Sequence, residues 1–171
     1  NWDKPFEAWT FHAISEKVTA PKFGHGLGVG DVNGDGRLDV IHSKGWLEQP
    51  AADATSKRWT SHDVSFTTAY GGAEMFAYDV DGDGDNDIIT SDAAHDFGLA
   101  WYEQVRKEGD NENSFVRHLI MGSHPSENRY GVLFSELHSL NLADIDGDGL
   151  KDIVTGKTYY SHHKQSPLWD A

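Results

Sequence analysis

The sequence predicts an all-β fold made of four-stranded antiparallel blades, of which the chain supplies about three. Two observations carry this prediction. A nine-residue loop rich in Asp and Gly occurs three times, and a short β-branched run follows each copy. The spacing between copies lies in or above the range of β-propeller blades, and no long segment has helical periodicity. The chain is therefore expected to be a propeller segment, either cut from a larger ring or part of an oligomeric one.

The clearest copy of the loop runs from Asp79 to Asp87, with carboxylates at positions 1, 3, 5 and 9. Glycines at positions 4 and 6 allow the tight turn, and the backbone carbonyl of position 7 can complete an oxygen shell. Ca²⁺ takes oxygen ligands of this kind, and without a cation the carboxylates would repel one another. The three copies predict three Ca²⁺ sites, with ligands from Asp31, Asn33, Asp35, Arg37, Asp39, Asp79, Asp81, Asp83, Asp85, Asp87, Asp144, Asp146, Asp148, Leu150 and Asp152.

Two other interpretations of the loops were weighed. An EF-hand has flanking helices and a glutamate at position 12, but position 12 is His42, Thr90 or Thr155 here. The remaining alternative is an acidic turn that holds no metal. Three matching copies favour calcium over that alternative.

Each unit repeats the same order of strands. An apolar strand enters the loop and a β-branched strand leaves it. A third strand has an aromatic-x-acid pattern, at 46–49 and 101–104, and a fourth closes the unit at 59–64 and 115–120. The fourth-strand pattern also occurs at 9–14, which predicts the outer strand of a preceding blade. The single domain, 1–171, is thus divided into an outer strand at 9–14, blades at 25–64 and 74–120, and a partial blade at 138–170.

The charge of the chain limits its partners. The formal net charge of −14 over 171 residues argues against nucleic-acid binding, and much of the acidic surplus lies in the three loops. The sequence has no cysteine and no run of transmembrane length, so neither disulfides nor membrane insertion are expected. The first residue, Asn1, suggests a processed or excised chain. Repetitive calcium modules are matched to extracellular calcium, which favours an extracellular, periplasmic or cell-surface location.

The three D-x-[DN]-G-D-G-x-x-D-[IV] loops, at 31–40, 79–88 and 144–153, resemble the FG-GAP/VCBS repeats of integrin-α-type β-propellers. Nearly the whole chain is covered, and the sequence is similar to environmental bacterial VCBS-repeat proteins. The resemblance implies that the strand before each loop is the innermost one. It also implies that the calcium loops share one face while the opposite face opens on a central channel. Because this family usually closes about seven blades, the remaining blades would come from the same polypeptide or from other copies of the chain.

If the resemblance holds, several polar side chains lie on the rim of that channel. His25 and His138 occupy equivalent positions before their loops, and Lys44, Asp92 and Lys157 follow the second strand of each unit, with Tyr159 nearby. These groups either bind a polar ligand, or act as general acid and base on a sugar, or are merely solvated. The catalytic candidates are His25, Glu74, Asp92, His95 and His138. A transition-metal site on His25 and His138 would need a third ligand that the sequence does not identify.

Two functions follow from these features. The first is a calcium-binding module, not an enzyme, that presents one face to a carbohydrate or a protein. The second is a carbohydrate-active enzyme of lyase or isomerase type, with its acid and base on the channel rim. A ring of three blades falls below the four to eight that propellers use, so the chain is not expected to be a closed monomer. The histidines His12, His62 and His118 recur in fourth strands and predict a structural position.

Overall fold

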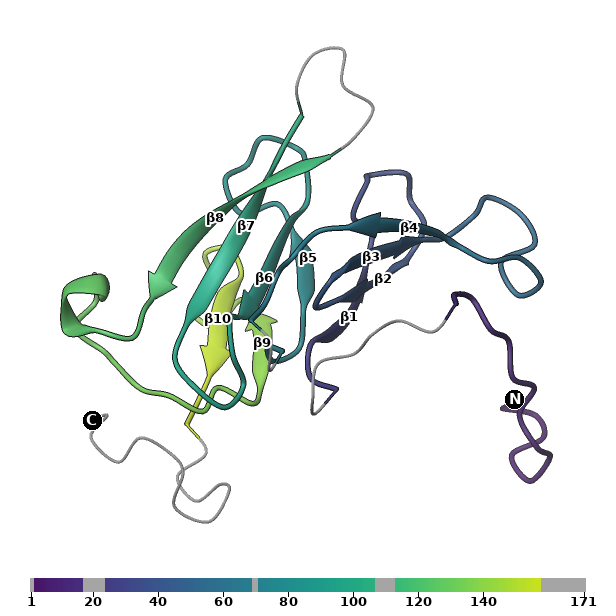
Figure 1. Cartoon of the computed structure of the whole chain (residues 1–171), viewed down its shortest axis with the longest axis horizontal. Helices are drawn as coiled ribbons and strands as arrows, with labels where there is room; N and C mark the ends of the chain where they lie inside the picture. The colour runs from purple at the N-terminus through teal and green to yellow at the C-terminus, as the bar shows by residue number, and fades with distance from the viewer. Residues whose placement is uncertain (1, 17–23, 69–70, 107–112, 158–171) are drawn as a thin grey trace.

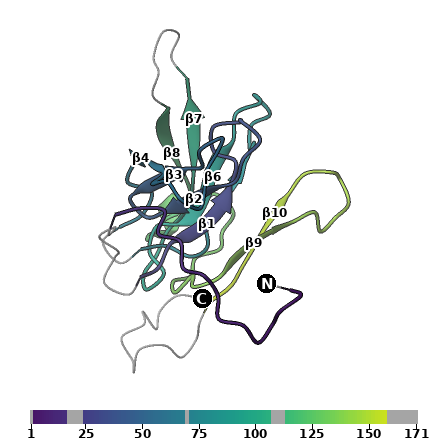
Figure 2. The same cartoon turned by 90° about the vertical axis from the view of Figure 1, so that its right-hand side faces the viewer.

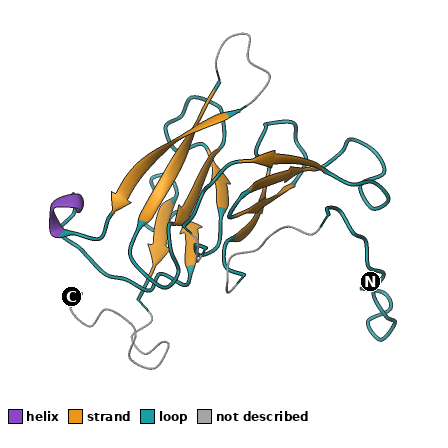
Figure 3. Ribbon diagram, in the orientation of Figure 1, coloured by secondary structure: helices purple, strands orange, loops and turns teal. Residues whose placement is uncertain are grey.

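A computed structural model describes residues 2–16, 24–68, 71–106 and 113–157 of the chain. These residues form two four-stranded antiparallel sheets and one two-stranded sheet (Figure 1). They contain no α-helix, and the single 3₁₀ turn, η1, spans Pro125–Glu127 (Figure 3). The described residues include no helix with the length and apolar character needed to cross a membrane. The predicted all-β class and the four-stranded antiparallel units are confirmed.

The two larger sheets have the same simple order, in which each strand pairs with the next strand along the chain. In both, the acidic loop connects the first strand to the second. The strands of the first sheet are β1 (Leu27–Gly30), β2 (Asp39–His42), β3 (Gly45–Glu48) and β4 (Thr60–Asp63). Those of the second are β5 (Phe76–Tyr78), β6 (Asp87–Ser91), β7 (Leu99–Val105) and β8 (Ser114–Met121).

The third sheet is the hairpin of β9 (Leu140–Ala143) and β10 (Asp152–Thr155), joined by the third acidic loop. Figure 2 shows this hairpin extending to one side of the two larger sheets. The partial blade was predicted to span 138–170, and residues beyond Lys157 lie outside the described part of the chain.

Successive sheets meet through their first strands. β1 and β5 approach at a parallel bridge between Gly28 and Met75, where the Met75 N–H donates to the Leu27 carbonyl at 3.1 Å. A Cβ at Gly28 would overlap the Met75 backbone, and one at Gly30 would crowd the Cβ of Ala77. The alternating glycines of this strand are therefore required by the close approach of the neighbouring sheet.

Two apolar clusters fill the spaces between the sheets. The first lies between the two larger sheets and includes Trp46, Phe66, Met75 and Tyr102. The second joins the second sheet to the β9–β10 hairpin through residues such as Leu137 and Leu140. Burial of this apolar area, especially of the aromatic rings, is the main force that holds the sheets together.

The apolar side chains at the two ends of this row of sheets remain exposed. On β1 the side chains of Leu27 and Val29 are 61% and 59% exposed, and at the far end Ile145 and Val154 are exposed as well. The described sheets do not close into a ring.

The prediction of a strand at 9–14 is wrong for the structure as described. Those residues pair with no strand, and Trp9 is largely exposed. The segment instead runs beside the loop before β4, where the Trp59 N–H donates to the Ile14 carbonyl at 2.7 Å and His12 Nδ1 lies 3.0 Å from the Thr55 carbonyl. A strand is formed only by pairing, and this segment pairs with none of the described strands.

Candidate metal centres

The three acidic loops share one hydrogen-bond framework built on the first Asp. Asp79 accepts the Gly82 N–H on Oδ1 at 2.7 Å and the Gly84 N–H on Oδ2 at 3.1 Å. Asp31 and Asp144 accept the N–H groups of the corresponding glycines at 2.8 to 3.1 Å. Both glycines of every loop have positive φ, between 75° and 96°, which L-residues rarely adopt. The first Asp and the two glycines, at their fixed spacing, therefore determine the conformation of each loop.

The ninth residue attaches each loop to its sheet. Asp87 accepts the Val80 N–H at 2.9 Å and the Gln104 N–H at 2.8 Å, and Asp39 accepts the equivalent pair from Val32 and Gln49, both at 2.9 Å. Both carboxyls are buried, and this burial raises their pKa above the ordinary Asp range, with the neighbouring loop carboxylates raising it further. A bound cation would stabilise these charges in place.

Carboxylate oxygens converge in the second and third loops. One oxygen each from Asp79, Asp81 and Asp87 lies within 4.8 Å of the others, and Asp144, Asp146 and Asp152 form the same arrangement. The position-5 residues, Asp83 and Asp148, are not part of these groups; each accepts the N–H of position 7 at 2.8 Å. Positions 1, 3 and 9 thus provide three oxygens that could hold a cation, while Asp85 and Leu150 stand at position 7 as predicted.

The first loop differs in its charge. Asn33 replaces a carboxylate at position 3, and the Arg37 guanidinium forms an ion pair with Asp35. Arg37 also donates from Nε to the Gln49 carbonyl at 2.8 Å, which fixes it beside the loop. A cation in this loop would share Asp35 with a built-in positive charge. Unlike the other two loops, the first loop has no group of three converging carboxylates among the described residues.

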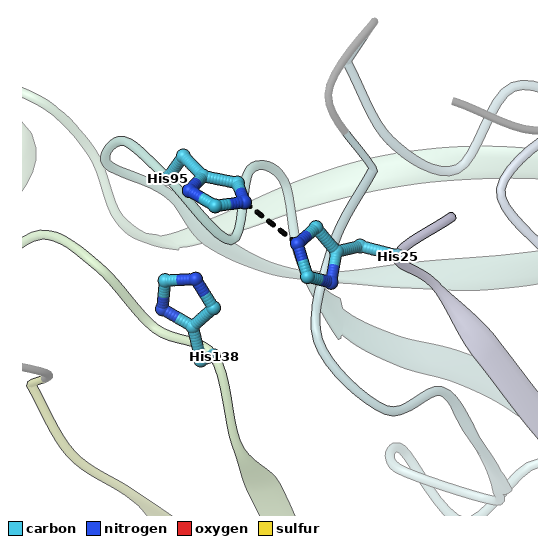
Figure 4. Close-up of side chains that lie close together, drawn as sticks. All are labelled: His25, His95 and His138. Atoms are coloured by element: carbon cyan, nitrogen blue, oxygen red, sulfur yellow. Dashed lines mark hydrogen bonds between the residues drawn. The ribbon is translucent and has the colours of Figure 1, made fainter. Parts of the chain in front are cut away.

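The opposite end of the inner strands carries a cluster of three histidines, His25, His95 and His138 (Figure 4). One ring nitrogen of each lies within 4.8 Å of the others, and the Nε2 atoms of His25 and His95 are 2.6 Å apart. The ring centroids are separated by 4.6 Å for His25 and His95, 4.5 Å for His95 and His138, and 5.4 Å for His25 and His138. All three side chains are partly buried.

Three separate segments bring these rings together. His25 stands just before β1 and His138 just before β9, while His95 lies in the connection between β6 and β7. Figure 1 shows the starts of β1 and β9 and the β6–β7 connection at one end of the sheets and the acidic loops at the other. The histidines and the acidic loops therefore lie at opposite ends of the sheets.

Three other residues predicted on the rim, Asp92, Glu74 and Lys44, have different surroundings. Asp92 is buried, accepts the Tyr102 hydroxyl at 3.1 Å and pairs with the Arg117 guanidinium, which raises the pKa of Arg117. Glu74 accepts the Leu140 N–H at 2.8 Å and so links the second sheet to β9. Lys44 borders a cavity of about 660 Å³ beside β4. Both carboxylates have structural partners, and Tyr159 lies outside the described residues.

The sequence did not identify His95 as the third member of the cluster. It placed His95 near the same rim, because the turn after the second strand was expected there, but gave no pairing with His25. It also missed Glu136, whose buried carboxylate lies 3.8 Å from Nδ1 of His138. Neither residue occupies a repeated position, so comparison of the three copies could not reveal them.

Two of the three recurring histidines, His62 and His118, lie in fourth strands and contact an aromatic ring and an acid of the third strand, whereas His12 lies in no strand. His62 stacks on Trp46 with ring centroids 4.0 Å apart and lies 2.9 Å from a Glu48 oxygen. In the second sheet His118 stacks on Trp101 at 4.4 Å and contacts Glu103 at 2.6 Å. The aromatic-x-acid pattern is therefore half of a cross-strand unit that the histidine completes.

Comparison of the chain with protein-family models, with curated proteins and with solved structures gave no match.

Proposed function

We propose that the chain is a calcium-binding β-propeller segment of FG-GAP/VCBS type that presents one face to a carbohydrate or protein ligand. The observation that carries the proposal is the common framework of the acidic loops, which recurs between the first two strands of all three sheets. Such repetition is expected of a loop with one conformation and one ligand. The presenting face is the end opposite the loops, where the histidines lie.

Calcium suits these loops for chemical reasons. The converging atoms are carboxylate oxygens, which are ligands for hard cations, and the glycine-rich backbone can adjust to the flexible geometry of Ca²⁺. The net charge of −14 also favours cation binding. Because such sites suit millimolar calcium, we infer an extracellular, periplasmic or cell-surface location.

The exposed end strands support the propeller part of the proposal. Leu27 and Val29 form an apolar face on β1, and Ile145 and Val154 lie at the other end of the row of sheets. Exposed apolar patches of this kind indicate an interface. The remaining blades of the same polypeptide, or other copies of the chain, would cover these faces.

Calcium removal tests the proposal. Ligand that binds only the folded state adds about 2.7 kcal/mol per site when free Ca²⁺ is 100 times Kd, which corresponds to about 5–10 °C in Tm for a chain of this size. We expect EDTA to lower Tm by at least this amount, added Ca²⁺ to restore it, and added Mg²⁺ to restore it less. An unchanged melt in EDTA, together with no calcium in elemental analysis, would contradict the proposal.

A second candidate function is a carbohydrate-active enzyme of lyase or isomerase type. It is favoured by the convergence of His25, His95 and His138, because imidazoles can accept and donate protons near neutral pH. Turnover should be measured on polysaccharides and keto-sugars. Activity that disappears in His138→Ala while calcium binding persists would favour the enzyme over the binding module.

A further inference from the structure

We propose that His25, His95 and His138 bind a divalent transition-metal ion of the zinc class and leave one coordination position open. The inference is separate from the calcium proposal, because the two kinds of site share no residue. In the first sheet, His25 and the acidic loop lie at opposite ends of β1, a four-residue strand about 13 Å long. Three imidazole nitrogens form a donor set for Zn²⁺ and its neighbours in the transition series, whereas Ca²⁺ prefers oxygen.

The distances fit such an ion after small movements. Zn–N bonds of about 2.0–2.1 Å in a tetrahedral site place two ligand nitrogens about 3.4 Å apart. In the cluster the closest pair, His25 and His95, is at 2.6 Å, and all three nitrogens lie within 4.8 Å. Rotation of partly buried rings can open the short distance and close the longer ones.

The short contact also shows that the rings can act as ligands. Two nitrogens at 2.6 Å form a hydrogen bond only if one carries a proton and the other offers a lone pair. At least one of His25 and His95 is therefore unprotonated at Nε2. An entering metal ion would displace the shared proton from Nε2, and the neutral ring would then carry its proton on Nδ1, so that both Nε2 atoms become ligands.

The surroundings of His138 resemble those of a metal-bound histidine. Its Nδ1 lies 3.3 Å from the Glu136 backbone carbonyl and 3.8 Å from the Glu136 carboxylate. Donation from Nδ1 to a carbonyl or carboxylate fixes the tautomer and leaves Nε2 for the metal. Glu136 itself is buried and has φ of 63°, an unfavourable backbone conformation for a residue other than glycine. In this backbone conformation the Glu136 carboxylate lies beside the histidine cluster.

Hydrogen bonds connect the segments that carry the three rings. The Ala94 N–H, next to His95, donates to the Gly71 carbonyl at 2.8 Å, and Gly71 packs closely against the backbone of His25. The Glu136 N–H donates to the Asp96 carbonyl at 3.0 Å, which ties the His95 loop to the His138 segment. The backbone around the cluster is thus held in place before any ion binds, as a preorganised site requires.

The open position sets the class of ligand that the ion could take. Three nitrogens fill three of the four positions preferred by Zn²⁺, and the fourth would hold water or an oxygen atom of a bound molecule. The rings are only partly buried, so solvent reaches them. The site is therefore suited to a hydroxyl or carboxylate oxygen, as found on a sugar or a uronic acid.

The test is a metal titration of the whole chain in excess Ca²⁺, which keeps the acidic loops occupied. After treatment with a chelator, Zn²⁺ is added in a calorimeter and Co²⁺ in a spectrophotometer. We expect one tightly bound ion per chain and a Co²⁺ spectrum typical of four- or five-coordination. His95→Ala and His138→Ala should each weaken binding at least about 100-fold, and Glu136→Gln about 10-fold. His124→Ala, at the exposed start of η1, is the matched control and should bind as the wild type does.

A second measurement needs no variant. In a ¹⁵N spectrum of the ring nitrogens, Zn²⁺ should shift three of the ten histidines and leave the others unchanged. A folded chain that takes up no stoichiometric Zn²⁺ or Co²⁺ would overturn the proposal. Equal affinity in the wild type, His95→Ala and His138→Ala would overturn it as well, because the ion would then lie elsewhere.

Discussion

The two ends of the first strands of the sheets carry candidate cation-binding groups of different origin. At one end each acidic loop is built within nine residues, and the hydrogen bonds that its first Asp accepts come from N–H groups at most five residues away. At the other end His25, His95 and His138 come from three connections and meet only when the sheets pack. The loops should therefore keep their conformation when packing is disturbed, while the histidine cluster should lose its geometry.

The largest expected effect comes from removing the buried residue of an acidic loop. Asp87→Ala leaves the N–H groups of Val80 and Gln104 without their acceptor and deletes a candidate calcium ligand. We expect a loss of about 2–4 kcal/mol in unfolding free energy, measured by urea denaturation with and without Ca²⁺. Asp85→Ala is the control, because its side chain makes only a surface ion pair with Arg106 and its carbonyl remains. Equal losses in the two variants would show that position 9 has no special role.

A smaller effect is expected at the contact between the first loop and the second sheet. Gln104 is buried and donates from Nε2 to the carbonyls of Val32 and Asn86 at 3.0 and 2.8 Å. Gln104→Ala should cost about 2–3 kcal/mol, because the buried Val32 carbonyl and the partly buried Asn86 carbonyl lose their partner. Gln49 holds the same position in the first sheet, but its hydrogen bonds to Asp39 and Arg37 come from its backbone N–H and carbonyl. Because Gln49→Ala keeps both groups, it should cost less. A Gln49→Ala loss as large as that of Gln104→Ala would contradict this account.

The third prediction separates the two ends of the strands. Ser91 is buried at the end of β6, accepts the Ala73 N–H at 2.7 Å and donates to the Leu137 carbonyl at 3.1 Å. Ser91→Ala should cost about 1–2 kcal/mol and loosen the segment that precedes His138. We expect weaker Zn²⁺ binding with unchanged Ca²⁺ affinity, and the reverse pattern for Asp87→Ala. If both variants weaken both ions equally, the two ends are not independent.

Sequence reasoning succeeded where structure is encoded locally or repeated. The strand after each loop and the glycine positions were found by aligning the copies, whereas the pairing of Trp46 with His62 was seen only in the structure. It failed at residues 9–14, where a repeated pattern occurs without a described partner strand. A β-strand depends on its neighbour as much as on its own residues, so a pattern alone cannot guarantee it.

The candidate sites show the same limit. The ligand residues of the loops could be proposed from spacing, whereas the position-5 ion pair of Asp35 with Arg37 could not. To predict the histidine cluster, one would have to know how three separate segments lie relative to one another. His95 also has no counterpart in the other copies. The distance between His25 and His95 depends on how β1 packs against β5, which the sequence pattern does not specify.

The smallest effect concerns a fourth histidine near the cluster. His42 pairs with Leu27 in register, so it lies at the same end of the first sheet as His25. Burial lowers the pKa of His42 below its ordinary value, although Asp63 partly opposes the shift. Its Nδ1 accepts the Lys44 N–H at 3.2 Å, and its buried Nε2 has no hydrogen-bond partner among the described residues. Protonation would therefore remove an acceptor and leave a charge without a partner.

The sign of the pH effect follows from this lowered pKa. The unfolded chain gains a proton on His42 at about pH 6.5, whereas the folded chain gains it only at lower pH. The contribution of neutral His42 to stability is complete above pH 6.5 and is lost as the pH falls towards the folded pKa. We expect His42→Gln to reduce the slope of unfolding free energy against pH between about 6.5 and 5 by a few tenths of a kcal/mol per unit. An identical slope in the wild type and the variant, from urea melts in saturating Ca²⁺, would show that His42 does not sense pH. Zn²⁺ affinity should stay unchanged in this variant, because only the three clustered rings face one another.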